Sequence, residues 1–363
     1  MAIEVKIQRT FGDFKLDVQF QSDSRRIGIL GASGCGKSLT LKSIAGIERP
    51  ETGRIKSGGR VFFDSESKRW MPPQERNVGY LFQNYALFPT MTVEKNIGIA
   101  LRCAKREKET KVREMIERFS LQGLEKKLPG QLSGGQQQRA ALARIMIYEP
   151  EMILLDEPFS ALDSYLKEQT QRECLELLRD YPGTVILVSH SRDEIYRFSE
   201  EVLVMDGGKV SVQKPVKELF EQPEKVAAAK LTGCKNIEEI RWKAGGIMYV
   251  PGWDMAIPGW QEKADTFRVI GIRAHEFTIA ATGADGEVVF PVLQPEVKED
   301  LFEYHVEFFT SECAKTPVVW KVSKRIWDIG EKGVPEKLYL KREHLLLLEK
   351  ETSIERASLC HLI

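Results

Sequence analysis

The sequence lacks long hydrophobic runs, an excess of either charge, and cysteines arranged in pairs. No apolar stretch of the 363 residues approaches the about 20 residues that a membrane-spanning helix needs. Lys plus Arg number 53, as do Asp plus Glu, so no global field favours nucleic acid or an anionic membrane surface. The six cysteines are scattered without a C-x-x-C pair, which argues against a disulfide framework or a zinc site and indicates a reducing cytoplasm. The N-terminus lacks the charged-then-apolar order of a signal peptide.

The chain length and a change in residue pattern predict two domains. Up to about residue 232, short apolar runs alternate with segments of helical spacing, which predicts a doubly wound parallel sheet. Beyond Gly233, short alternating stretches rich in Trp, Val, Pro and Gly predict a small all-β domain. We therefore expect one domain at 1–232 and a second at 236–363.

The stretch Gly31–Ser38 fits the phosphate-binding pattern G-x-x-x-x-G-K-[ST]. The apolar run Arg26–Leu30 before it predicts a buried strand, and Leu39–Gly46 after it predicts a helix. Glycines let successive backbone N–H groups surround a phosphate, and the helix N-terminus adds its dipole. We expect Lys37 to reach the β- and γ-phosphates of ATP and Ser38 to hold magnesium. The predicted ATP-binding residues are Gly31, Ala32, Ser33, Gly34, Cys35, Gly36, Lys37, Ser38 and Leu39.

Polar residues follow predicted strands at three further places. Each strand is a short apolar run, and ligand-type residues at the carboxyl ends of such strands are typical of a doubly wound parallel sheet. The strands and the residues that follow them are Asn77–Phe82 with Gln83, Met152–Leu155 with Asp156 and Glu157, and Thr184–Ser189 with His190.

The motif Leu132–Gln136, which reads LSGGQ, opens another predicted helix. Ser133 and the amides of Gly134 and Gly135 would cap the N-terminus of this helix and form a second cradle for phosphate. This motif lies between Gly31–Ser38, the phosphate-binding loop or P-loop, and the apolar run that ends in Asp156-Glu157-Pro158. A motif in this place is a highly specific signature of one protein family.

Together with Ser160–Asp163, these motifs resemble the nucleotide-binding subunit of ABC transporters over roughly the first 230 residues. All the elements occur in the order found in that family. The resemblance implies an ABC cassette of the P-loop NTPase class, with a parallel-sheet core and antiparallel β and helical subdomains. It also implies ATP hydrolysis with Mg²⁺ and a homodimer. In that dimer, two chains sandwich two ATP molecules head to tail, so neither site is complete in one chain.

The resemblance assigns each motif residue a role in phosphoryl transfer to water, which needs positioning and charge neutralisation. Glu157 would be the general base, and His190 would contact the γ-phosphate. Gln83 would touch magnesium or the attacking water, while Ser38 and Asp156 complete the magnesium set. The residues that would face the nucleotide of the other subunit are Ser133, Gly134, Gly135, Gln136 and Asp163.

Three positions leave alternatives open. Phe11 falls where the family places an aromatic residue that stacks on adenine, with Phe14 as the fallback. His190 is followed by Ser191, whereas many members of the family carry Asp there. Cys35 lies at a helix N-terminus, which lowers the pKa of a thiol. It is either a redox-sensitive thiol or simply a small residue that fits the loop.

The segment Gln83–Val93 is typical of importers fed by a binding protein. It predicts that a helix of a transmembrane permease docks near Gln83, Tyr85 and Phe88. The expected partners are therefore this permease and, indirectly, a substrate-binding protein, with no nucleic acid. The subunit would lie peripherally on the cytoplasmic face of the membrane.

The segments Leu231–Ile237 and Val269–His275 resemble the ATPases of molybdate and sulfate importers. The second domain would then be of the TOBE, oligonucleotide-binding-like type. Molybdate or tungstate is the first expectation for the substrate and sulfate the second. The oxyanion-binding motif of the best-known molybdate-binding domains is absent, so the anion and any ligand-regulated role stay open.

Two other classes of function compete with an importer. A non-transport ABC mechanoenzyme usually carries two cassettes or a long coiled-coil insertion, and neither is present. A regulatory β-barrel protein with a vestigial ATPase is disfavoured because Lys37, Glu157 and His190 are intact.

The second domain itself has two candidate roles, a dimerisation platform or a sensor of the transported anion. A sensor needs convergent donors in one pocket, and the candidates are Arg273, His275, Ser311 and Lys315. The missing oxyanion motif favours the platform.

Overall fold

The structure, a computed structural model, describes residues 3–160, 164–259, 268–281, 283, 286–329 and 333–349. It divides into two compact units, Met1–Lys217 and Glu218–Ile363, and each is described by itself. This division precedes the boundary that the sequence predicts at residues 232–236. Within the described ranges, no helix is long and apolar enough to cross a lipid bilayer.

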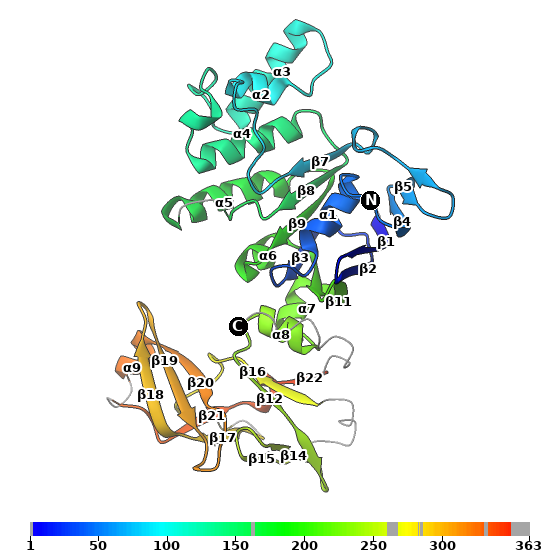
Figure 1. Ribbon diagram of the computed structural model, residues 1–363. Coiled ribbons are helices and arrows are strands. Elements are labelled where there is room, and N and C mark those ends of the chain that lie inside the picture. Colours follow the sequence, from blue (N-terminus) through cyan, green and yellow to red (C-terminus); the bar gives the residue numbers. More distant parts are fainter. Residues whose placement is uncertain are drawn as a thin grey trace. The chain divides into compact units, whose positions relative to one another are not determined.

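A six-stranded sheet forms the centre of the first unit (Figure 1). Its order is β11-β10-β3-β9-β8-β7, and every neighbouring pair is parallel except β10 with β11. All residues of β3, β8 and β9 are buried, as their uninterrupted apolar runs predict. The carboxyl ends of these strands therefore meet at one edge. The strands are β3 (Arg26–Gly31), β7 (Val78–Leu81), β8 (Met152–Asp156), β9 (Thr184–Ser189), β10 (Glu201–Asp206) and β11 (Lys209–Pro215).

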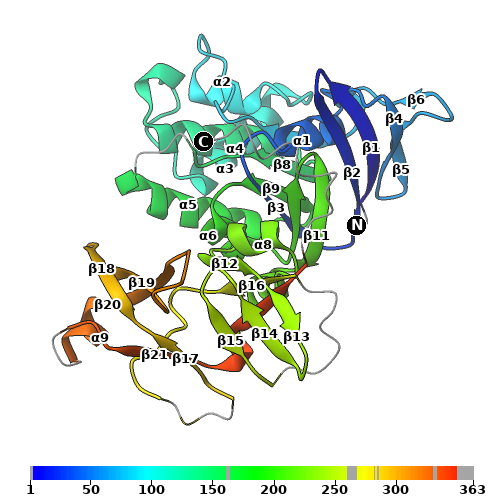
Figure 2. The same cartoon turned by 60° about the horizontal axis from the view of Figure 1, so that its bottom comes forward.

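An antiparallel sheet of order β2-β1-β4-β5-β6 carries the N-terminus of the described chain. One face of this sheet, helix α1 and one face of the central sheet share the main hydrophobic core. Figure 2 shows the antiparallel sheet and the helices α2, α3 and α4 on different sides of the central sheet. The strands are β1 (Ile3–Phe11), β2 (Phe14–Ser22), β4 (Thr52–Ser57), β5 (Arg60–Asp64) and β6 (Arg69–Trp70).

Helices α2, α3 and α4 pack on one another, and α1 packs on β3, β7 and β8. The helices are α1 (Lys37–Ala45), α2 (Val93–Gly98), α3 (Lys105–Arg118), α4 (Gly134–Met146), α5 (Ser164–Arg179) and α6 (Arg192–Phe198); α7 (Val216–Glu221) spans the division between the units. Single 3₁₀ turns lie at η1 (Pro73–Glu75) and η2 (Pro129–Gln131).

A buried arginine fixes the C-terminal end of α1. Arg76 is 0% exposed, and its guanidinium donates to the carbonyl oxygens of Ser43 at 2.8 Å and Ile44 at 2.7 Å. A cation at the carbonyl end of a helix also meets the negative end of its dipole. Gly46 ends the helix with a φ of 82°, and a Cβ there would lie 2.6 Å from Arg76 Nε. The helix that follows the P-loop is thus anchored at its far end.

The second unit is built mainly from short antiparallel strands around its own core, which contains Trp253, Phe290, Phe308 and Trp320. Its sheets have the orders β12-β16-β22, β13-β14-β15, β17-β21 and β18-β19-β20. The strands are β12 (Asn236–Glu239), β13 (Arg241–Lys243), β14 (Ile247–Val250), β15 (Met255–Ile257), β16 (Val269–Ile272), β17 (Val288–Pro291), β18 (Leu293–Glu299), β19 (Glu303–Phe309), β20 (Val318–Ser323), β21 (Lys337–Leu340) and β22 (Leu345–Leu348). Two short helices, α8 (Val226–Leu231) and α9 (Lys324–Ile329), and the 3₁₀ turn η4 (Arg342–His344) accompany them.

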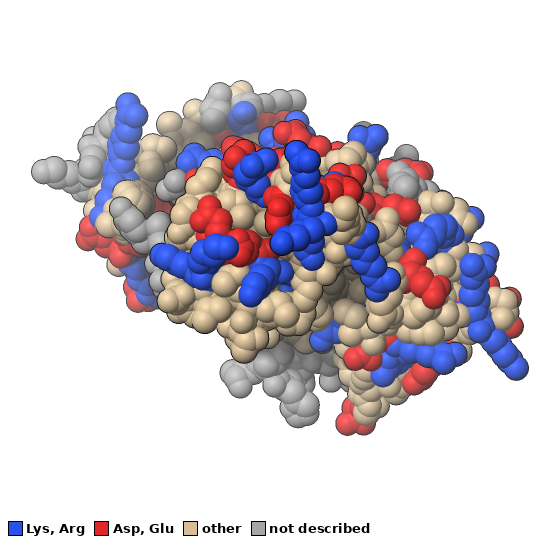
Figure 3. Space-filling model, turned by 90° about the horizontal axis from the view of Figure 1, so that it is seen from above, with Lys and Arg blue, Asp and Glu red and all other residues tan. Residues whose placement is uncertain are grey.

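Charges of both signs are interspersed on the face drawn in Figure 3. Lys and Arg side chains there alternate with Asp and Glu, without a broad area of one sign. This mixed pattern agrees with the equal totals of basic and acidic residues in the sequence.

Candidate nucleotide-binding site

The P-loop joins the end of β3 to the start of α1. Gly34 and Gly36 have φ angles of 79° and 102°, which side chains with a Cβ rarely adopt. At Gly36 a Cβ would also lie 2.6 Å from a methyl group of Leu16. Ala32, Ser33 and Gly34 are exposed, so the tip of the loop is open to a ligand.

Lys37 lies inside the loop rather than in solvent. Its side chain is buried, and Nζ donates to the carbonyl oxygens of Gly31 at 2.8 Å and Ala32 at 2.9 Å. A buried ammonium group held by carbonyl oxygens of the loop provides the positive charge that a phosphate requires.

The structure brings together Ser38 and Asp156, two residues of the predicted magnesium site. Ser38 Oγ donates to Asp156 Oδ1 at 2.7 Å, and the hydroxyl of Tyr80 donates to Asp156 Oδ2 at 2.8 Å. Hydroxyl and carboxylate oxygens are the ligands that Mg²⁺ prefers, so these residues fit the metal. Gln83 lies exposed in the turn that follows β7, the strand next to β8. Burial, followed by the Asp156 carboxylate, raises the pKa of Tyr80 and keeps its hydroxyl a donor.

Glu157 and His190 follow the neighbouring strands β8 and β9, and their side chains approach each other. His190 Nδ1 lies 3.5 Å from Glu157 Oε2. Glu157 has a φ of 47°, and its N–H donates to the carbonyl oxygen of Val188 at 3.1 Å. A non-glycine residue in this left-handed region is uncommon, and active sites are among the places where it recurs. The bend aims the carboxylate away from the strand direction, beside the imidazole.

Ser191, which follows His190, caps a helix. It is the N-cap of α6, and its Oγ accepts from the N–H of Glu194 at 3.4 Å. Serine and aspartate are both favourable at this position because each offers a side-chain oxygen. A serine after His190 is therefore compatible with the start of this helix.

Ser133 opens α4 with a reciprocal cap. Its Oγ accepts from the N–H of Gln136 at 3.4 Å, and the side chain of Gln136 accepts from the N–H of Ser133 at 3.0 Å. Ser133 is exposed, and Gly134 and Gly135 form the first turn. The start of α4 is thus an accessible helix N-terminus of the kind that favours anions. Asp163 lies outside the described residues.

Comparison with known proteins agrees with this geometry. The sequence profile of the family described as ABC transporter matches residues 15–160. A relative from Rhizobium etli, named Fe(3+) ions import ATP-binding protein FbpC, is 36% identical over 288 residues, which cover 77% of this chain and 79% of the relative. The chain belongs to the ATP-binding subunits of ABC importers.

Other importer ATP-binding subunits and solved cassettes are also similar. Spermidine/putrescine import ATP-binding protein PotA from Oleidesulfovibrio alaskensis is 38% identical over 239 residues, covering 64% of this chain and 62% of that protein. Molybdenum import ATP-binding protein ModC from Paramagnetospirillum magneticum is 33% identical over 247 residues, covering 68% and 65%. The dimeric structure of MJ0796, a bacterial ABC transporter cassette, matches with a TM-score of 0.51 and 26% identity over 60% of this chain and 99% of that one. The predicted family, cassette fold and ATPase activity are thereby confirmed.

The two aromatic candidates for adenine lie at the two sides of the β1–β2 turn of this importer subunit, where Phe11 pairs with Phe14. The guanidinium of Arg9 covers the Phe11 ring at 4.4 Å from its centre. The Phe14 ring instead faces the P-loop, because a Cβ on Gly36 would lie 3.2 Å from its tip. Phe11 and Phe14 are both partly exposed.

The prediction that the helix N-terminus lowers the pKa of Cys35 is wrong. The side chain is 6% exposed, and burial raises the pKa of its thiol despite the nearby positive charge of Lys37. A Cβ on Gly31 would lie 2.5 Å from Cys35 Sγ, so the sulfur packs directly on the loop. Because the thiolate is the reactive form, this structure favours the reading of Cys35 as a small residue that fits.

The turn after Gln83 is held in an uncommon shape. Tyr85 and Ala86 have φ angles of 60° and 46°, and Arg144 of α4 donates to their carbonyl oxygens at 2.9 and 2.7 Å. The Tyr85 side chain is 4% exposed, and burial raises its pKa to about 12. This burial removes Tyr85 from the predicted docking surface. Phe88 is 44% exposed and lies under the Arg144 guanidinium.

Two polar residues at this site, Tyr80 and Arg144, are not among the predicted ones. Tyr80 lies in the predicted strand before Gln83, and a tyrosine at that place is a signal for a hydroxyl near the strand end. Arg144 lies three turns into the helix that LSGGQ opens, and the sequence carries no signal for its partners because they are backbone atoms.

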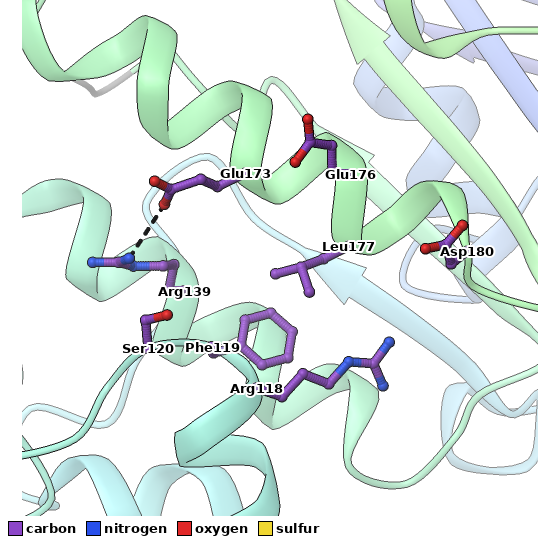
Figure 4. A pocket seen from close by; sticks show the side chains of 8 residues that line it. All are labelled: Arg118, Phe119, Ser120, Arg139, Glu173, Glu176, Leu177 and Asp180. Carbon is purple, nitrogen blue, oxygen red and sulfur yellow. Dashed lines mark hydrogen bonds and ion pairs between the residues drawn. The ribbon is translucent and has the colours of Figure 1, made fainter.

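A separate groove lies between α3, α4 and α5 of this subunit (Figure 4). It encloses about 420 Å³, and Arg139 reaches Glu173 across it at 3.4 Å. Its lining residues are Arg118, Phe119, Ser120, Arg139, Glu173, Glu176, Leu177 and Asp180. It contains none of the predicted nucleotide-binding residues.

The four candidate donors for an anion sensor in the second unit are engaged with other partners or exposed. Arg273 donates to the carbonyl oxygen of Thr232 at 2.7 Å, and Ser311 donates to Asp254 Oδ2 at 2.8 Å. His275 Nε2 lies 3.4 Å from a carboxylate oxygen of Glu276. Lys315 is exposed.

Proposed function

We propose that this importer ATPase works as a homodimer bound to a membrane permease and drives uptake of an oxyanion, molybdate or tungstate first and sulfate second. The observation that carries the catalytic part is the contact of Glu157 with His190 beside the Ser38–Asp156 pair. Glu157 takes the role of general base, and Mg²⁺, when bound with ATP, neutralises charge on the phosphates. The exposed N-terminus of α4, capped by Ser133, completes the site of the other copy.

The anion assignment rests on the segments Leu231–Ile237 and Val269–His275 and on the similarity to the molybdenum import subunit. Fe³⁺ is the alternative to an oxyanion, because the Rhizobium etli relative named for Fe(3+) import matches 77% of the chain and the molybdenum import relative matches 68%. Both cargoes use the same ATP site, since the cargo is recognised outside this subunit.

Uptake by cells that lack this chain separates the two cargoes. Restoring the chain is expected to restore uptake of molybdate or tungstate, while a Glu157→Gln variant restores none. Recovery of Fe³⁺ uptake alone would replace the oxyanion assignment and leave the importer role standing. Recovery of neither would argue against both cargoes.

The proposed position of the subunit is the cytoplasmic face of the membrane, with the turn after Gln83 against a permease helix. Phe88 is the exposed apolar contact of this turn, and the buried Asn96 shapes the backbone around it. Asn96 Oδ1 accepts from the N–H of Phe88 at 2.8 Å, and its Nδ2 donates to the Phe88 carbonyl oxygen at 3.1 Å. A preformed turn with a protruding ring suits the docking of a helix.

Phe88→Asp is expected to reduce substrate uptake strongly while the isolated subunit keeps its ATPase rate within about twofold, since exposed substitutions usually cost little stability. Removing an aromatic anchor typically costs an interface about 2 kcal/mol or more. Uptake in cells and ATPase of the purified chain measure the two effects. Ile47→Asp, at a residue 43% exposed in the turn after α1, is the matched control. Normal uptake with Phe88→Asp would exclude this turn as the docking site.

The second unit is proposed to be a dimerisation platform rather than an anion sensor. Arg273 and Ser311 are the best placed candidate donors, and they donate hydrogen bonds to Thr232 and Asp254. These bonds orient both side chains toward protein atoms. The TOBE-type assignment of this unit is part of the same proposal.

A further inference from the structure

Tyr80 reaches the end of β8 from the neighbouring strand. In the register of this parallel pair, Tyr80 lies opposite Leu154, and Asp156 lies two residues further along β8. Side chains two residues apart in a strand share one face and are about 7 Å apart along it. A tyrosine side chain spans that distance, so its hydroxyl meets the Asp156 carboxylate.

Each oxygen of the Asp156 carboxylate accepts a hydrogen bond from a different element. Ser38 of α1 donates to Oδ1 at 2.7 Å, and Tyr80 of β7 donates to Oδ2 at 2.8 Å. Asp156 is only 7% exposed. Two donors on opposite oxygens of a buried carboxylate fix its rotation, and the hydroxyl oxygen of Ser38 keeps its lone pairs for a cation.

The ring of Tyr80 is itself held in place. It packs against the main core and lies 4.5 Å, centre to centre, from the ring of Phe82. Phe82 immediately precedes Gln83. The hydroxyl therefore sits on a rigid arm that also contacts the residue leading into the Gln83 turn.

We propose that Tyr80 is a positioning residue that orients the Asp156 carboxylate and thereby sets the affinity of the nucleotide site for its divalent cation. The inference rests on the proposed assignment of Ser38 and Asp156 to the magnesium site. Groups that orient a metal ligand without touching the metal typically change metal affinity about 10–100-fold when they are removed.

The test is Tyr80→Phe, which removes the hydroxyl and keeps the ring. Calorimetry measures the affinity of the purified full chain for the non-hydrolysable ATP analogue AMP-PNP, in EDTA and in saturating MnCl₂. The affinity in MnCl₂ divided by the affinity in EDTA is the ratio that reports metal binding, and it is measured without any turnover. Tyr80→Phe is expected to lower this ratio about 10-fold and to leave the affinity in EDTA unchanged. An unchanged ratio would overturn the inference.

Two control variants separate the hydroxyl from the fold. Tyr148→Phe removes another tyrosine hydroxyl, which lies 3.5 Å from the carbonyl oxygen of Val78 at the opposite end of β7, and should leave the ratio unchanged. Phe82→Leu loosens the ring that carries the hydroxyl but keeps the hydroxyl itself, so it should lower the ratio less than Tyr80→Phe does. Equal unfolding temperatures of Tyr80→Phe and Tyr148→Phe are expected.

Asp156→Asn distinguishes failure of this inference from failure of the metal-site assignment. This variant should lower the ratio whether or not Tyr80 matters, and Tyr80→Phe should add little in its background. If Asp156→Asn leaves the ratio unchanged, the magnesium assignment is wrong and the role of Tyr80 falls with it. If Asp156→Asn lowers the ratio and Tyr80→Phe does not, only the role of Tyr80 is wrong.

Discussion

Replacement of Glu157 by glutamine is expected to abolish steady-state ATP hydrolysis while leaving ATP binding intact. A positioned general base contributes roughly 10²–10⁴-fold to the rate. The amide keeps the size and hydrogen-bonding capacity of the side chain, but it cannot accept the proton of the attacking water. The backbone bend at Glu157 and the bond of its N–H to Val188 are unaffected, so we expect the variant to fold normally.

Two chains that hold two ATP molecules between them and cannot cleave them should stay dimeric. Size-exclusion chromatography of Glu157→Gln with saturating ATP should therefore show a dimer. Glu151→Gln is the control, because Glu151 precedes β8 at the opposite end and pairs with Arg60 at 3.4 Å. Elution as a monomer would contradict the sandwich of two chains, and wild-type hydrolysis would remove Glu157 from the role of base.

Lys37→Ala is expected to weaken ATP binding itself by about 10–100-fold, which corresponds to the loss of charge-assisted hydrogen bonds. The buried ammonium group is the positive charge inside the P-loop, and alanine leaves the carbonyl oxygens of Gly31 and Ala32 without their donor. Calorimetry with ATP measures the loss. Lys42→Ala, one turn further along α1, is the matched control and should bind normally.

Ser133→Arg should affect dimer formation rather than ATP binding. Ser133 is exposed at the N-terminus of α4, so an arginine there should spare ATP binding by the single chain and block closure of the dimer. Calorimetry with ATP measures binding by the single chain. Size-exclusion chromatography of Ser133→Arg in the Glu157→Gln background measures dimer formation. Equal loss of binding from Lys37→Ala and Ser133→Arg would show that the site is not shared between two copies.

Local pattern was enough to predict the elements that carry the nucleotide site. The P-loop between β3 and α1 and the reciprocal cap at Ser133 each depend on residues adjacent in sequence. The apolar run of β8 is buried at every residue, which is why its polar end could be predicted to reach the site. Gln83, Glu157 and His190 follow the strand ends on which the sequence places them.

The features that the sequence could not supply depend on contacts between distant segments. The register of β7 against β8 decides that Tyr80 meets Asp156, and this register is set by the whole sheet. Burial of Cys35 comes from packing on Gly31, and it reverses the local effect of the helix N-terminus on the thiol. The segment Gln83–Val93 predicts Tyr85 at the docking surface, whereas the fold buries its side chain.

The hydrogen bonds of Arg144 to the carbonyl oxygens of Tyr85 and Ala86 connect α4 to the turn that bears Phe88. Ser133 stands at one end of this helix and Arg144 is eleven residues away, which corresponds to about 16 Å at 1.5 Å per residue. A tilt of about 10° about the Ser133 end would displace the Arg144 end by about 3 Å, by this length. The two hydrogen bonds from Arg144 hold the turn that bears Phe88 to the helix, so we expect this turn to move with α4. We therefore expect a displacement of the Ser133 end of α4 to be transmitted to the exposed ring of Phe88.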